Sequence, residues 1–258
     1  MGHWALAQYD STAVNLSTDR PTQTATSQLL KKGVWQIETG YAITQFEAFD
    51  IIRGVTPRDL LMEQPVTVNI TQVRFGITDK VELNFSQSVS KTRFKRGTTV
   101  ERSTPSEFTP TSLAVRVHVA EAKGLRPQLA VLTGFSGSPF NGGEDEWEYT
   151  FRLAASHSLA KGLSLGYNAG FDLVDEYRNL RGLYTLVLNY ELFKRFFVFG
   201  ELYGTFPRIG FAEHSFSYGA TYLANNNIQF DIYGGANVSE RAPDTLFGCG
   251  LSVRIPKR

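Results

Sequence analysis

The chain alternates apolar and polar residues over many short stretches, most clearly in its last third, 196–255. In the stretch SFSYGATYL, which begins at Ser215, the large residues Phe216, Tyr218 and Tyr222 share one face. Small and polar residues share the other face. A period of two is the signature of a β-strand, because successive side chains point to opposite faces. A strongly aromatic face opposite a small, polar one is typical of a barrel that turns its apolar side to lipid.

About twelve such stretches follow one another, and the connections between them alternate in length. Tight reversals lie at 77–80, 121–126, 159–162, 193–195 and 224–227, and longer connections at 46–64, 91–110, 136–145, 206–214 and 238–244. An even strand number, short periplasmic turns and longer outer loops characterise bacterial outer-membrane barrels. The sequence therefore predicts an all-β fold, a transmembrane antiparallel up-and-down β-barrel in the bacterial outer membrane. Both termini then lie in the periplasm.

The pattern divides the chain into residues 1–32 and a barrel over 33–258. Residues 8–32 are rich in Ser, Thr, Gln and Asp without apolar periodicity, and they read as a periplasmic or lumen-entering segment. Ala5-Leu6-Ala7 has the A-x-A form of a secretory cleavage site. It is either the end of a truncated leader or a chance match.

Composition narrows the function classes. The 258 residues carry a formal net charge of +1, which gives no electrostatic reason to expect a nucleic acid partner. The sequence contains no run of about 18 apolar residues, so it predicts no transmembrane helix. The single cysteine, Cys249, shares its face with large apolar residues and is expected to face lipid. No metal-ligand spacing, phosphate-binding loop or nucleophile motif is present, so we expect neither a metal or other cofactor nor enzymatic activity.

Several short motifs occur in a characteristic order. They are Ser17-Thr18-Asp19-Arg20-Pro21 with Gln23-Thr24, the stretches 33–40 (GVWQIETG) and 199–207 (FGELYGTFP), Arg74-Phe75-Gly76, and Ala242-Pro243-Asp244. With these motifs the chain, from about Ser17 to Ile255, resembles the bacterial outer-membrane β-barrel family of transporters of the phenol meta-degradation pathway. The resemblance implies a β-barrel that passes small organic molecules.

The inward face of the predicted strands carries many ionisable residues. They are Glu38, Arg74, Glu82, Arg116, His118, Glu148, Arg152, Asp172, Glu201, Asp231 and Arg254. Counting along each strand places one group near mid-height (Glu38, Arg116, Arg152 and Glu201) and a second near the periplasmic mouth (Arg74, Glu82 and Arg254). A mixed ring of charges can act as a selectivity filter. Alternatively, acids and arginines pair across the lumen and plug it.

Two segments outside the strands add partner hypotheses. Residues Ser17 to Pro21 either plug the pore, dock another envelope protein or form a solvated leader. The basic segment from Lys91 to Arg96, with Arg102, is a candidate contact for lipopolysaccharide phosphates. Two functions follow: a channel for small-molecule solutes in outer-membrane lipid, or an accessory barrel subunit with a closed lumen in a complex with other envelope proteins.

Overall fold

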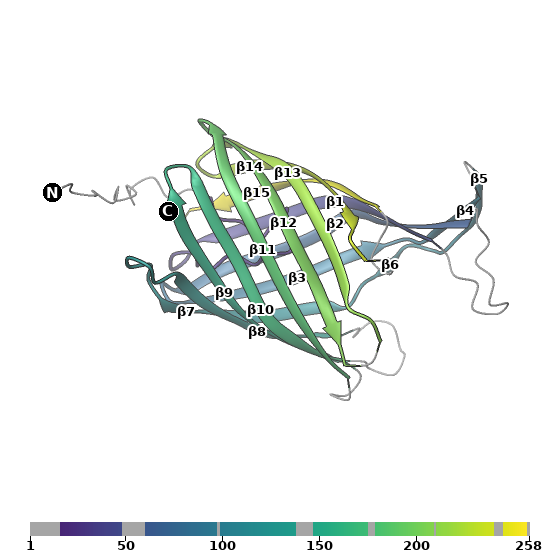
Figure 1. Ribbon diagram of the computed structural model, residues 1–258, viewed down its shortest axis with the longest axis horizontal. Coiled ribbons are helices and arrows are strands. Elements are labelled where there is room, and N and C mark those ends of the chain that lie inside the picture. Colours follow the sequence, from purple (N-terminus) through teal and green to yellow (C-terminus); the bar gives the residue numbers. More distant parts are fainter. Residues whose placement is uncertain are drawn as a thin grey trace.

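The computed structural model describes residues 16–47, 60–96, 99–137, 147–174, 179–208, 210–239 and 245–256. Twelve of its strands form a closed antiparallel barrel whose strands tilt strongly against the barrel axis (Figure 1). They are β1 (Trp35–Glu47), β2 (Leu60–Thr78), β3 (Val81–Ser90), β7 (Thr111–Ala120), β8 (Gln128–Gly137), β9 (Glu148–Ala160), β10 (Leu163–Val174), β11 (Asn179–Phe193), β12 (Phe196–Pro207), β13 (Glu213–Asn225), β14 (Ile228–Asn237) and β15 (Thr245–Ile255). No helix in these residues is long and apolar enough to cross a bilayer.

Closure comes from the pairing of the first and last strands. Trp35 lies opposite Ile255, and the register continues to Gln45 opposite Thr245. Each of the twelve strands thus has a neighbour on both sides, and no barrel strand leaves its N–H and C=O groups unpaired along an edge. The predicted fold class and strand number are confirmed.

The wall follows the predicted alternation. On β1, the Trp35 and Ile37 side chains face outward and are 46% and 36% exposed, whereas Glu38 is 0% exposed. Cys249 also lies on the exposed face. Because lipid surrounds such a barrel, the outward apolar residues need no protein core to bury them.

Two predicted connections differ from the structure. The long connection expected at 46–64 is shorter, because β1 runs to Glu47 and β2 begins at Leu60. The expected polar loop 91–110 contains three short strands, β4 (Arg93–Arg96), β5 (Thr99–Ser103) and β6 (Glu107–Phe108). β4 pairs with the first residues of β2, Leu60 to Glu63, and the β4–β5 hairpin stands beyond the rim at the end opposite the β7–β8 turn (Figure 1).

Tight turns connect the strands at the other end of the barrel. The β2–β3, β9–β10 and β11–β12 turns each have two residues outside the strands. Gly162 in the β9–β10 turn has a φ of +75°, a conformation that glycine adopts without steric cost. β1 begins and β15 ends at this same end, so the residues before Trp35 enter the lumen here.

Candidate functional site

Residues 16–32, hereafter the plug, lie inside the barrel lumen without forming a strand. Leu16, Ser27 and Leu30 are only 7%, 1% and 6% exposed. Irregular backbone in a lumen must still satisfy its N–H and C=O groups. The barrel wall supplies those partners, strand by strand, as the plug passes around the interior.

The wall of β10 and β12 holds the middle of the plug. Glu201 accepts hydrogen bonds from the backbone N–H groups of Gln23 at 3.0 Å and Thr24 at 2.8 Å, and from the Thr24 hydroxyl at 2.7 Å. Asn168 bonds Ala25 twice, accepting from its N–H at 2.7 Å and donating to its carbonyl at 2.9 Å. These inward side chains replace the hydrogen bonds that a regular element would make within itself.

Two further wall carboxylates hold the ends of the plug. Glu38 on β1 accepts from the N–H groups of Asp19 at 3.0 Å and Arg20 at 2.9 Å. Glu82 on β3 accepts from the Leu30 N–H at 2.7 Å. Hydrogen bonds to an ionised acceptor are stronger than those between neutral groups, so three buried glutamates give the plug a defined path.

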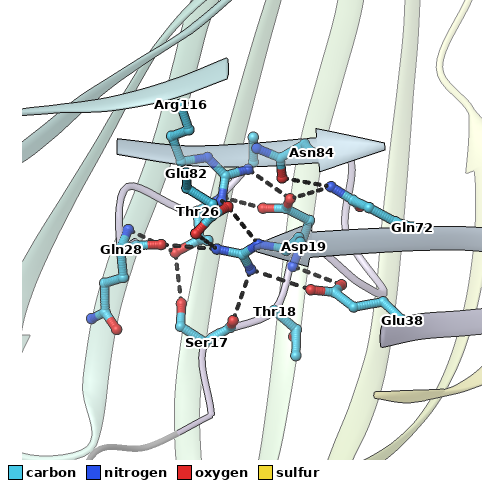
Figure 2. A network of polar contacts seen from close by, with 12 residues as sticks. Ser17, Thr18, Asp19, Thr26, Gln28, Glu38, Gln72, Glu82, Asn84 and Arg116 are labelled. Carbon is cyan, nitrogen blue, oxygen red and sulfur yellow. Dashed lines mark hydrogen bonds and ion pairs between the residues drawn. The ribbon is translucent and has the colours of Figure 1, made fainter. Parts of the chain in front are cut away.

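The same carboxylates belong to a buried ion-pair cluster (Figure 2). Arg74 contacts Glu82 at 2.8 Å and Glu38 at 3.2 Å. Arg116 contacts Glu82 at 3.1 Å and Asp19 of the plug at 2.6 Å. Burial by itself raises the pKa of the Asp19 carboxyl, but Arg116 and Arg74 outweigh it and hold that pKa well below its usual range. Acids and arginines therefore pair with one another here.

The cluster joins residues that strand counting placed at different heights. Glu82 lies directly opposite Arg116 in the β3–β7 register, and Arg74 is opposite Gln36 on β1. Strands in a barrel are staggered, so equal counts from a turn do not mean equal heights. The long side chains of Arg74 and Arg116 span the remaining distance to the carboxylates. Glu38 and Arg116 from one predicted level and Arg74 and Glu82 from the other thus belong to one network.

Arg20 anchors the plug on β14 and β15, the strands that continue the wall from β1 on the side away from β2. Its guanidinium donates to Asp231 at 3.1 Å and to the Cys249 carbonyl at 3.1 Å. It lies over Gly40 and Gly250, which face each other across the β1–β15 pair. A Cβ atom at either glycine would overlap the guanidinium, so these two positions leave the space that Arg20 occupies.

A second charged group lies on β9, β10 and β11. Arg181 donates to Glu148 at 2.8 Å and to Asp172 at 2.9 Å. Asp172 also accepts from the Thr150 hydroxyl at 2.8 Å. Arg152 is on the same face of β9 as Glu148, but its Nε atom is buried without a hydrogen-bond partner among the described residues.

The other predicted candidates lie apart from both groups. The His118 imidazole lies 3.5 Å from the Glu121 carboxylate, near the β7–β8 turn. Arg254 donates to the Asn227 side chain at 3.1 Å, at the turn end of the barrel. Of the plug candidates, Ser17 accepts at its carbonyl from Arg74, and the Thr18 hydroxyl accepts from Gln229 at 3.0 Å. Pro21 follows Arg20 and makes none of these polar contacts.

Sequence reasoning missed the neutral partners of the plug. Gln36, Asn168, Thr185 and Gln229 all contact it, and each has the inward parity of its strand. The inward position of these neutral residues on their strands was the sequence signal that could have identified them. The prediction selected ionisable residues instead. An inward apolar cluster was missed as well, made of Ala42, Val187, Phe199 and Tyr233 with Leu246 packed against them.

Comparison with solved structures supports the fold. The COG4313 outer membrane channel from Pseudomonas putida F1 has 13% identity and a TM-score of 0.68, covering 91% of this chain and 100% of its own. The translocator domain of the autotransporter NalP from Neisseria meningitidis has 12% identity and a TM-score of 0.54, covering 88% and 90%. Comparison with curated proteins gives no match.

A family profile matches residues 18–255, which include most of the plug and all twelve barrel strands. The match confirms the resemblance drawn from the ordered motifs. The architecture is that of an outer-membrane β-barrel, and the chain belongs to the family described as "Putative MetA-pathway of phenol degradation".

Proposed function

We propose that this barrel is an outer-membrane channel for small organic molecules with a substantial apolar part. The observation that carries the proposal is the apolar cluster of Ala42, Val187, Phe199, Tyr233 and Leu246 on the inward faces of β1, β11, β12, β14 and β15. A water-filled pore has a polar interior. An apolar stretch of wall instead favours solutes that lose water on entry. The family description, which refers to phenol degradation, supports the same solute class.

Passage requires the plug to move, because residues 16–32 occupy the lumen. The plug is attached to the wall by hydrogen bonds and ion pairs and is covalently continuous with β1 only through residues 33 and 34. None of these contacts is covalent or part of the strand pairing, so the plug can leave without unfolding a strand. In this proposal the structure is the closed state, and displacement of the plug opens a path past the apolar cluster.

Orientation and partners form part of the proposal. We place the tight-turn end in the periplasm and the β4–β5 hairpin outside the cell, because outer-membrane barrels have short periplasmic turns. The hairpin carries Arg93 and Arg102, which suit contact with lipopolysaccharide phosphates. Residues 1–15, where the leader and cleavage-site hypothesis falls, lie outside the described residues. The proposal is of transport without catalysis, as is usual for this fold.

A reversible crosslink tests the proposal directly. The hydroxyl oxygens of Ser27 in the plug and Ser156 on β9 lie 2.7 Å apart, close enough for two cysteines at these positions to form a disulfide. We would combine Ser27→Cys and Ser156→Cys with Cys249→Ser, which removes the native exposed thiol. Cells expressing this variant are supplied with N-phenyl-1-naphthylamine, a small apolar dye that fluoresces once inside membranes. Each single-cysteine variant is the matched control.

The expected result is slow dye uptake in oxidised cells and faster uptake after reduction, with no redox effect in the controls. Equal uptake before and after reduction, but above that of cells lacking the barrel, would show a channel that the plug does not close. Uptake no faster than in cells lacking the barrel would refute the channel itself. It would leave the accessory-subunit function, for which the filled lumen is the supporting observation.

A further inference from the structure

Arg152 differs from the other arginines that the described residues place inside the barrel. Arg20, Arg74, Arg116 and Arg181 each contact at least one carboxylate within 3.2 Å. The Arg152 Nε atom, in contrast, is shielded from solvent and has no hydrogen-bond partner among the described residues. Glu148 interacts with Arg152 electrostatically but does not accept a hydrogen bond from Nε. An arginine with an unused buried donor is a ready partner for an anion, because its fork of donors matches a carboxylate.

The residues beside Arg152 are not competing acceptors. In the strand register, Leu132 on β8 lies opposite it on one side and Gly170 on β10 on the other. Leu183 on β11 lies opposite Gly170 in turn. All four positions face inward, so Arg152 lies between Leu132 and Leu183, and Gly170 beside it has no side chain. An apolar body attached to an anionic group fits such surroundings better than a hydrated inorganic ion does.

The nearest acids are already engaged. Glu148 and Asp172 both accept from Arg181, at 2.8 Å and 2.9 Å, and Asp172 also accepts from Thr150. Glu148 also interacts electrostatically with Arg152, so these acids moderate the local positive charge while the Nε–H of Arg152 still lacks an acceptor. A monovalent group is consequently favoured over a multiply charged one.

We propose that Arg152 binds the carboxylate of an amphipathic solute, with Leu132 and Leu183 contacting the apolar part. The inference rests on the proposed channel function and names the class of solute: organic monocarboxylates. No residue of the ion-pair cluster at Asp19 has to rearrange for binding, because Arg152 lies outside that network.

A matched probe pair tests the inference on the purified, detergent-solubilised full chain. Octanoate and octanol have the same alkyl body and differ in charge. Binding is measured by equilibrium dialysis of each radiolabelled probe for the wild type, Arg152→Gln, Arg152→Lys and the control Arg254→Gln. Heat-modifiable gel mobility verifies that each variant retains a folded barrel.

We expect the wild type to bind octanoate about tenfold more tightly than octanol. Arg152→Gln should remove that preference and leave octanol binding unchanged, Arg152→Lys should retain part of it, and Arg254→Gln should retain all of it. Equal loss of both probes in Arg152→Gln would overturn the inference, since it would indicate a structural role. Saturable octanol binding without octanoate preference in the wild type would also overturn it, while the channel function stands. Failure of both probes to bind saturably would refute the inference and weigh against the apolar-solute channel as well.

Discussion

Removal of Glu201 should loosen the plug more than any other single change in the wall. Its carboxylate accepts three hydrogen bonds from Gln23 and Thr24 and a fourth from the Ser217 hydroxyl at 2.9 Å. A hydrogen bond to a charged group contributes about 1.5–3 kcal/mol. Three plug bonds would give about 5–9 kcal/mol if they were additive. The freed donors regain water in a loosened lumen, and we therefore expect a loss of about 2–4 kcal/mol in docking free energy.

That loss corresponds to a rise of about 30-fold to 1000-fold in the undocked population. The Glu201→Ala variant is compared with Glu201→Gln, whose amide oxygen can still accept hydrogen bonds and which should show a smaller rise. A Ser27→Cys reporter in a Cys249→Ser background is labelled with maleimide, and the labelling rate follows the undocked population. Ser27 is 1% exposed in the docked plug, so the background rate should be low.

Glu213→Ala is the matched control, because Glu213 is an exposed glutamate on the neighbouring strand β13 without a hydrogen bond to the plug. If Glu201→Ala and Glu213→Ala give the same labelling rate in folded barrels, the wall carboxylates do not hold the plug and the reasoning is wrong. A rate in Glu201→Gln equal to that in Glu201→Ala would show that charge, rather than hydrogen-bond acceptance, is decisive.

Three further predictions concern the lumen. Gly40→Ala places a Cβ in the space of the plug's arginine and should lower the thermal unfolding midpoint, whereas outward-facing Gly200→Ala, which has nothing within 4 Å, should not. Arg74→Leu leaves two buried carboxylates without this ion-pair partner and should lower the free energy of unfolding in urea by about 3–5 kcal/mol. A decrease below about 1 kcal/mol would contradict the pairing. The double variant Arg116→Ala with Arg152→Ala should shift the reversal potential of single channels toward cation selectivity, and an unchanged potential would count against a lumen charge filter.

The barrel was predictable because its wall obeys a period of two over most of its length. One face of each strand carries most of the exposed large apolar residues described between Trp35 and Ile255, as expected of a face turned to lipid. Strand ends were less predictable. Near Leu60 the polar and apolar residues follow no clear alternation, and Pro65 argues against a strand interior, yet β2 extends across both.

The docking of the plug could not be predicted from its own sequence. Ser, Thr and Gln in residues 16–32 would look the same in a solvated leader, because neither state produces apolar periodicity. The barrel wall determines the path of the plug, because Glu201, Asn168 and Gly40 contact it from strands that are far apart in the sequence. Such long-range matches follow from barrel closure and register, which a local pattern does not contain.

The plug's two adjacent charges give it a fixed orientation. Asp19 reaches Arg116 on β7, while Arg20 reaches Asp231 on β14, so consecutive residues of opposite sign point to different parts of the wall. A shift of the plug by one residue would bring Arg20 toward the arginines in one direction, and Asp19 toward Asp231 in the other. Burying like charges together is strongly unfavourable, so the wall selects one register against its neighbours. We therefore propose that the wall charges first specify the register of the closed plug, and that those the plug does not contact, such as Arg152, act on the solute.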